Sequence, residues 1–223
     1  MIARNIAGNI LTAVIAGCAV IVTVVTVRRS VSTTSDAESI SRADKTVPVW
    51  TTYLAAGNRI GNAGSPVKIL EFGDFECPVC GEFARSTLRG IRTKYGDQVQ
   101  VVFRNWPLPY HRFAYPAARA AECAAAQGKF ESYFDAVYNK QDSLGLKTFE
   151  SFARESHVPD IPAFDRCNSI AGTVPSVEAD IAAAKAIGGH GTPTIVINGM
   201  MIANSLDSTR IDSLVRAAIA AAR

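Results

Sequence analysis

The alternation of apolar and polar residues predicts an ordered series of elements from residue 66 onwards. Short apolar or alternating runs predict strands at 67–72, 98–103, 194–197 and 201–203. Helical patterns predict helices at 78–95, 117–127, 130–139, 148–155, 176–187 and 207–222. The order is strand, helix, strand, a long helical block, a strand hairpin and a helix. It predicts an α/β domain whose mixed sheet is flanked by helices on both faces.

Two turn signals support these boundaries. Gly96 directly follows the predicted helix 78–95, and glycine is the usual residue just past a helix end. Asn198 and Gly199 stand between the last two predicted strands, and this pair is typical of a tight hairpin turn. Residues 49–65 show no clear pattern, and we expect Trp50 and Tyr53 to pack on the domain.

The residues before the domain have a different pattern. Residues 6–27 are uncharged, and as a helix they would span roughly 33 Å, enough to cross a bilayer core. We therefore expect residues 1–29 to be a transmembrane anchor. Two alternatives stay open: a cleaved signal peptide, and a lipoprotein in which Cys18 is lipidated, because residues 15–18 resemble a lipobox. Residues 30–48 are rich in Ser, Thr and charges and predict a flexible linker to a domain of residues 49–223.

Length and charge narrow the function classes. A chain of 223 residues can build one substantial core besides its N-terminal segment. The formal net charge of +3 comes from Arg4, Arg28 and Arg29, and acids and bases balance beyond residue 30. No basic stripe stands out there, so nucleic acid is not an expected partner. The charges on either side of the apolar segment are also nearly balanced, so they do not predict its orientation.

Two cysteines stand three positions apart in EFGDFECPVCGEFA, residues 71–84, directly after a predicted strand. A structural zinc site needs four ligands, whereas Cys123 and Cys167 are isolated and the three histidines have no paired spacing. We therefore expect no metal. A disulfide that closes so short a loop removes little entropy from the unfolded chain, so a purely structural staple is also disfavoured.

The position of Cys77 favours redox chemistry instead. At the start of a helix, the macrodipole and the unpaired backbone N–H groups both favour a thiolate. Cys80 lies one turn further on the same face, within disulfide reach, and Pro78 suits the first helical turn. We expect Cys77 to be the reactive thiol and Cys80 the resolving one. Pro78 and Val79 complete the loop, and the disulfide Cys77–Cys80 needs no further cofactor.

This segment, together with PLPYHRFAYPAARAAECA (residues 107–124) and GTPTIVING (residues 191–199), resembles the DsbA-like thiol:disulfide oxidoreductases. The likeness covers about residues 65–223. It implies a thioredoxin fold with an inserted helical subdomain at about 111–188. It also implies that Thr192 and a cis Pro193 lie beside the cysteines. The chain departs from the best-known members at Val79, where a histidine often stands.

The resemblance also suggests a role for Glu71, six residues before Cys77, where thioredoxin-like proteins carry a buried acid. A carboxylate behind the pair could accept a proton from Cys80 as that thiol ionises. We expect Asp74 and Glu76, by contrast, to be exposed.

The two remaining cysteines of the domain both fall in the predicted helical block. Cys123 and Cys167 are expected to form a structural disulfide, because an oxidising compartment favours a matched pair over two free thiols.

Together these features predict an enzyme of the bacterial cytoplasmic membrane, with a single anchor and its catalytic domain on the periplasmic side. The expected activity is oxidation of dithiols in extended or unfolded secreted polypeptides. The expected redox partner is a DsbB-like or related quinone-linked membrane protein. Two alternatives stay open: an extracytoplasmic disulfide reductase, and a non-catalytic module that binds peptides in the cis-proline groove.

Overall fold

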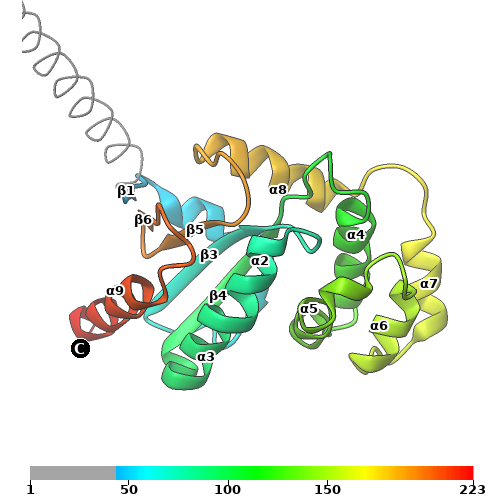
Figure 1. The fold of residues 1–223 in the computed structure, drawn as a ribbon, viewed down its shortest axis with the longest axis horizontal. Coiled ribbons are helices and arrows are strands. Elements are labelled where there is room, and N and C mark those ends of the chain that lie inside the picture. Colours follow the sequence, from blue (N-terminus) through cyan, green and yellow to red (C-terminus); the bar gives the residue numbers. More distant parts are fainter. Residues whose placement is uncertain (1–43, 223) are drawn as a thin grey trace, which may run out of the picture. The chain divides into compact units, whose positions relative to one another are not determined.

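Strand β3 (Val67–Gly73) forms the centre of the sheet, and six of its seven residues are buried. In the computed structural model, which describes residues 44–222, the strand order is β1-β6-β5-β3-β4-β2 (Figure 1). Strand β3 pairs in parallel with β4 (Val99–Asn105) and antiparallel with β5 (Thr194–Ile197). The predicted mixed sheet is confirmed.

The edges of the sheet extend the prediction and correct the linker boundary. Strand β2 (Asn58–Ile60) pairs with β4, and β6 (Met200–Met201) forms the hairpin with β5 that Asn198 and Gly199 turn. Residues 45–48 were expected to belong to the linker. Instead, Lys45–Thr46 form β1, which pairs with β6, and the Val47 amide donates to the Gly199 carbonyl oxygen at 2.8 Å.

The alternation of residues along β3 directs its side chains to two separate cores. Ile69 belongs to the larger core, which lies under the helix that follows β3 and under the inserted helices. Leu70 and Phe72 belong to the second core, with Trp106 and Ile187. Since successive residues of a strand point to opposite faces, Glu71 lies on the same face as Ile69, towards the larger core.

The helix after β3 is continuous, as the pattern predicts. It consists of α2 (Pro78–Glu82), a π-helical turn (Phe83–Leu88) and α3 (Arg89–Tyr95). It ends at Gly96, whose φ of 51° is a left-handed value that favours glycine.

Five α-helices lie between β4 and β5 along the chain, and a sixth follows β6. Helices α4 to α7 group together at one side of the sheet (Figure 1). The bounds are α4 (Ala114–Ala125), α5 (Phe130–Asn139), α6 (Phe149–Glu155), α7 (Ile161–Asn168), α8 (Pro175–Ala186) and α9 (Ser208–Ala221). Helix α7 was not predicted. Its start nevertheless carries a readable signal, because the Asp160 side chain accepts a hydrogen bond from the Ala163 amide and so caps the helix.

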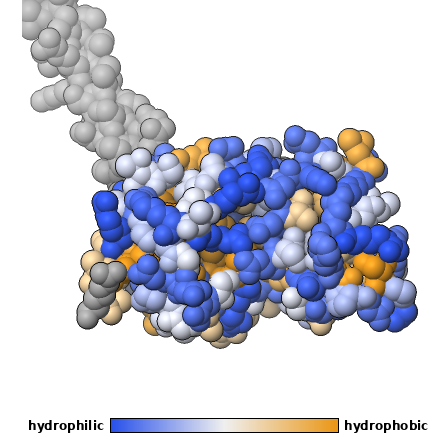
Figure 2. All heavy atoms as spheres, turned by 90° about the horizontal axis from the view of Figure 1, so that it is seen from below, coloured by the Kyte–Doolittle hydropathy of each residue, from blue (hydrophilic) through white to orange (hydrophobic). Residues whose placement is uncertain are grey.

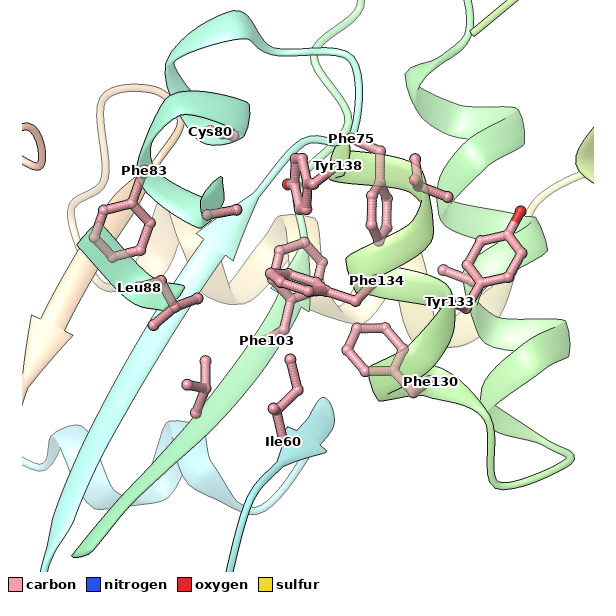
Figure 3. Packing of buried hydrophobic residues seen from close by; sticks show 14 of the residues in the cluster. Ile60, Phe75, Cys80, Phe83, Leu88, Phe103, Phe130, Tyr133, Phe134 and Tyr138 are labelled. Atoms are coloured by element: carbon pink, nitrogen blue, oxygen red, sulfur yellow. The ribbon is translucent and has the colours of Figure 1, made fainter. Parts of the chain in front are cut away.

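A cluster of aromatic rings joins the inserted helices to the sheet. Phe134 and Tyr138 of α5 have ring centroids 4.8 Å apart, and Phe103 of β4 lies 5.3 Å from Phe134 (Figure 3). Phe75, in the segment between β3 and α2, lies 5.1 Å from Tyr138. All four side chains are fully buried, so the insertion packs directly against the segment that carries the cysteine pair.

Two further links fasten the inserted helices. Cys123 of α4 and Cys167 of α7 form a disulfide, the pairing that we expected. On the second face, the Arg104 Nε of β4 donates to Asp180 Oδ1 of α8 at 2.6 Å. The Asn105 amide donates to the other oxygen of the same carboxylate at 2.8 Å. Both charged side chains of this pair are buried, which fixes α8 on the sheet.

Across residues 44–222, no helix combines the length and the hydropathy that crossing a membrane requires. The predicted anchor at 6–27, the alternative lipidation site at Cys18 and the linker up to residue 43 lie outside the described residues. On the face shown in Figure 2, apolar side chains gather in separate patches between hydrophilic ones.

Removing the Cys123–Cys167 disulfide should lower the free energy of unfolding by about 4 kcal/mol, because the bond closes a loop with a sequence separation of 44 residues. The measurement is urea unfolding of a Cys123→Ala/Cys167→Ala variant, made with Cys77 and Cys80 both changed to serine so that the redox pair cannot contribute. The same serine background with Cys123 and Cys167 intact is the control. A loss below about 1 kcal/mol would contradict the structural role.

Candidate active site

Cys77 is the N-cap of α2 and has an extended backbone, while Pro78 takes the first helical position. Cys77 and Cys80 are both free thiols; Cys77 is 5% exposed and Cys80 is fully buried. The arrangement matches the expectation for a cysteine at a helix start, because Pro78 has no N–H and the next amides of the first turn face the sulfur.

The surroundings of the two sulfurs shift their pKa values in opposite directions. The pKa of Cys77 falls from its usual 9.0 to about 5, chiefly because the Cys80 thiol donates to its thiolate. The backbone N–H groups of Cys80 and Val79 act in the same direction, and burial opposes them. Burial raises the pKa of Cys80 well above its usual range, and its bond to Cys77 raises it further. The pair therefore holds one thiolate and one thiol at neutral pH.

The loop before β5 closes over Cys77. The Thr192–Pro193 peptide bond is cis, as the resemblance implied. When Cys77 is protonated, its thiol donates to the Thr192 carbonyl oxygen at 3.5 Å. Pro78 and Val79 are exposed on the outer side, Val79 by 41%. The predicted loop residues are thus gathered around one reactive sulfur.

Glu71 lies in β3 and is fully buried, in keeping with the buried acid expected there. Neither of its carboxyl oxygens has a hydrogen-bond partner among residues 44–222. Burial, and then the negative charge of Cys77, raises the pKa of Glu71 from 4.5 to about 8. A negative charge on Glu71 would in turn raise the pKa of Cys80. At neutral pH the site therefore contains a neutral, unbonded carboxyl group close enough to influence both cysteines.

Asp74 corrects our expectation of an exposed acid, because it is only 1% exposed. Its Oδ1 accepts the Glu76 amide at 2.8 Å, and its Oδ2 accepts the Leu108 amide at 2.8 Å and His111 Nδ1 at 2.7 Å. Glu76 is half-buried and accepts the Phe113 amide. These acids tie the cysteine loop to the segment after β4. The sequence did not reveal the link, because their partners stand in a loop without periodicity.

Three other aromatic or histidine side chains are divided between core and surface. Trp106 is 8% exposed and packs in the second core, whereas Tyr110 is 75% exposed and His190 is exposed. No group of three or more His, Cys, Asp and Glu side chains within residues 44–222 is arranged to hold a metal ion. The chemistry that the described site offers is thiol–disulfide exchange.

Comparison with known proteins places this fold and this pair in a family. Residues 55–217 match the protein-family model described as Thioredoxin. DsbA2 from Pseudomonas aeruginosa superposes with a TM-score of 0.55 and 25% sequence identity, over 70% of this chain and 91% of that chain. The chain is a DsbA-like member of the thioredoxin family. It is a thiol:disulfide oxidoreductase of that family, with Cys77 and Cys80 as its CxxC pair.

Two further likenesses describe this DsbA-like chain more fully. The oxidised form of BdbD from Bacillus subtilis superposes with a TM-score of 0.68 over 80% of this chain and 98% of that chain. At 19% identity it shows the fold alone. The protein named Na(+)/H(+) antiporter NhaA from Herminiimonas arsenicoxydans is 31% identical over 157 residues, which is 70% of this chain. The chain spans about a quarter of the length of that curated relative.

Alkylation of the reduced DsbA-like protein should label Cys77 before Cys80, with a pH midpoint near 5, because only the thiolate reacts. The measurement is the rate of iodoacetamide labelling against pH, followed by mass mapping. Cys80→Ser, which keeps a donor, should retain a low midpoint, whereas Cys80→Ala should raise it. A wild-type midpoint between 8 and 9, the range of an ordinary thiol, would show that Cys77 is not activated.

Glu71→Gln should remove a pH-dependent loss of stability. Because the pKa of the folded carboxyl, about 8, lies above its ordinary 4.5, the unfolded chain gives up this proton first as pH rises. Wild-type stability therefore falls between these two values and levels off above the higher one. Urea unfolding should show the advantage of the variant growing by roughly 2 to 4 kcal/mol from pH 5 to pH 8. Glu82→Gln, at an exposed position of α2, is the control. A constant difference for Glu71→Gln would refute a buried neutral carboxyl.

Proposed function

We propose that this DsbA-like protein oxidises pairs of thiols in extended or unfolded secreted polypeptides, outside the cytoplasmic membrane of a bacterium. The observation that carries the proposal is the stabilised thiolate of Cys77, whose pKa is about 5. A thiolate that is stable in the reduced protein favours reduction of the Cys77–Cys80 disulfide. That disulfide is then a strong acceptor of electrons from substrate thiols.

The reaction proceeds in two exchanges that pass two electrons to the cysteine pair. A substrate thiolate attacks the Cys77 sulfur of the Cys77–Cys80 disulfide, a mixed disulfide forms, and Cys80 leaves as a thiolate. A second substrate thiolate then attacks the substrate sulfur of the mixed disulfide. The substrate disulfide forms, and Cys77 leaves as a thiolate.

Glu71 exchanges a proton with Cys80, the cysteine whose thiolate is not stabilised. Cys80 is buried and its pKa is raised, so its thiolate must gain a proton soon after it leaves. The neutral carboxyl of Glu71 is buried on the face of β3 towards the same core and has a pKa of about 8, which suits transfer of a proton near neutral pH. In the reverse direction, when the pair is oxidised again, Glu71 takes the proton back from Cys80.

The surroundings of Cys77 support a polypeptide substrate. Val79 is an exposed apolar residue between the two cysteines, and Thr192 places its backbone next to the Cys77 sulfur. The exposed ring of Tyr110 packs against His111, which contacts Asp74 just before the cysteine pair. An extended chain could lie along this loop and bring a cysteine to Cys77.

The chemistry and the sequence support a location and a partner for this reaction. An oxidising compartment maintains disulfides such as Cys123–Cys167, and the uncharged residues 6–27 have the length of a membrane anchor. After each cycle the dithiol of Cys77 and Cys80 needs an electron acceptor. We propose a quinone-linked membrane protein for this task.

The reduction potential tests the direction of the reaction. Equilibration of the Cys77–Cys80 pair with glutathione should give a potential nearer to about −120 mV than to about −270 mV, the values of a strong oxidant and of a strong reductant in this fold. A value of about −270 mV would favour the alternative, a disulfide reductase.

Cys77→Ser should abolish exchange with a reduced, unfolded protein, because the variant lacks the sulfur that forms the mixed disulfide. If the wild type binds that protein but oxidises it no faster than Cys77→Ser does, the pair is not the catalyst and the alternative, a peptide-binding module, is favoured.

A further inference from the structure

The inserted helices donate hydrogen bonds to the backbone of the cysteine loop. Gln141, just after α5, uses its Nε2 to donate to the Phe75 and Cys77 carbonyl oxygens, each at 2.8 Å. The Tyr138 hydroxyl, at the end of α5, donates to the Asp74 carbonyl oxygen at 3.2 Å. Three carbonyl groups of residues 74–77 are therefore held by two side chains from one short segment of the insertion.

The Gln141 amide is itself held in one orientation. Arg85, in the π-helical turn that follows the cysteine pair, donates from Nη1 to Gln141 Oε1 at 3.4 Å and to the Tyr138 carbonyl oxygen at 2.8 Å. With its oxygen towards Arg85, the amide presents both of its hydrogens to the loop. A flip would break these contacts, so the side chain acts as a fixed bridge between the active-site helix and the loop before it.

Gly81, the residue after Cys80, leaves the space that this bridge occupies. A Cβ atom at Gly81 would lie 2.0 Å from Gln141 Oε1 and 2.8 Å from both Gln141 Cδ and Nη1 of Arg85, the side chain that holds Gln141. Glycine within a helix costs about 1 kcal/mol relative to alanine, so its presence in α2 has a local disadvantage. The close approach of Gln141 explains why a side chain is excluded at this position.

We propose that Gln141 is a positioning residue for the redox pair, which it serves by fixing the backbone at the start of α2. The Cys77 carbonyl accepts both the Gly81 amide, at 3.1 Å, and Gln141, so the bridge sets the orientation of the N-cap residue. That orientation decides whether the Cys77 sulfur meets the N–H groups of Val79 and Cys80. This role rests on the proposed function, because it acts through the Cys77 thiolate.

The chain offers matched controls that separate this role from general stabilisation. Gln127 makes a similar side-chain bridge elsewhere in the insertion, with Nε2 donating to the Asp160 carbonyl at 3.0 Å and Oε1 accepting its amide at 2.9 Å. Gly90 is a glycine of α3, and a Cβ atom there would meet nothing within 4 Å, so alanine fits without displacing a neighbour.

The first test is Gln141→Met in the full chain, since methionine fills the space but cannot donate. Without the bridge, the thiolate absorbance of Cys77 at 240 nm should titrate at a higher pH than in the wild type. The equilibrium with glutathione should shift about three- to tenfold towards the disulfide form, the size expected for one or two hydrogen bonds. Gln127→Met should change neither quantity.

The second test moves Gln141 without altering it. Gly81→Ala should displace the side chain and shift both quantities in the same direction as Gln141→Met, whereas Gly90→Ala should leave them unchanged. The double variant Gly81→Ala/Gln141→Met should shift no further than the larger single change, because both act through one contact. If Gln141→Met fails to fold, Gly81→Ala with its control decides the question.

Two outcomes separate the two proposals. In the first, the wild type titrates near pH 5 and exchanges disulfides while each variant stays within twofold of it, both in the acid dissociation constant of Cys77 and in the equilibrium constant with glutathione. That result would overturn the positioning role and leave the proposed function intact. A wild type with neither a low-pH thiolate nor exchange would overturn the proposed function, and the role of Gln141 with it.

Discussion

A negative charge on a nearly buried sulfur is the feature on which the rest of the site depends. Cys77 is 5% exposed, so water stabilises its thiolate little and the protein must supply the donors. The Cys80 thiol and the backbone amides of Val79 and Cys80 do so. A second buried charge beside it would be costly, which is consistent with Glu71 holding its proton near neutral pH. Burial is the main reason that Glu71 and Cys80 keep their protons, and the charge of the Cys77 thiolate adds to it.

Donors stabilise a charge best when they do not have to reorganise, and the fold provides that rigidity from two sides. The central strand β3 leads directly into the cysteine loop, and it pairs with β4 over its whole length and with β5 from Ile69 to Phe72. From the other side, the rings of Phe75 and Tyr138 pack together and bring the end of α5 onto the same loop. The insertion is therefore part of the active-site structure, although Cys77 and Cys80 both lie in the part of the chain that precedes it.

The sequence predicted the features that depend on local pattern and on pairs of rare residues. Strands such as Thr194–Ile197, the helix start at Cys77 and the pairing of Cys123 with Cys167 belong to this group. It did not predict strand β1, the burial of Asp74 or the contacts of Gln141. Each of these depends on a partner far away in the sequence: β1 on β6, Asp74 on the loop after β4, and Gln141 on carbonyl groups 64 and 66 residues before it. Backbone acceptors are present at every residue, so the sequence gives no sign of which ones are used.

The shared volume of Gly81 and Gln141 bears on how the cysteine motif can be transferred between proteins. The motif Cys-Pro-Val-Cys could be taken for a self-contained unit, in which the two residues between the cysteines alone set the redox properties of the pair. Here the glycine that follows them is matched to a side chain some 60 positions later. If the motif were placed in a thioredoxin domain that lacks the inserted helices, the space beside this glycine would have no side chain to fill it. In this protein the motif and the insertion pack against each other, so a larger residue at Gly81 requires a change at Gln141.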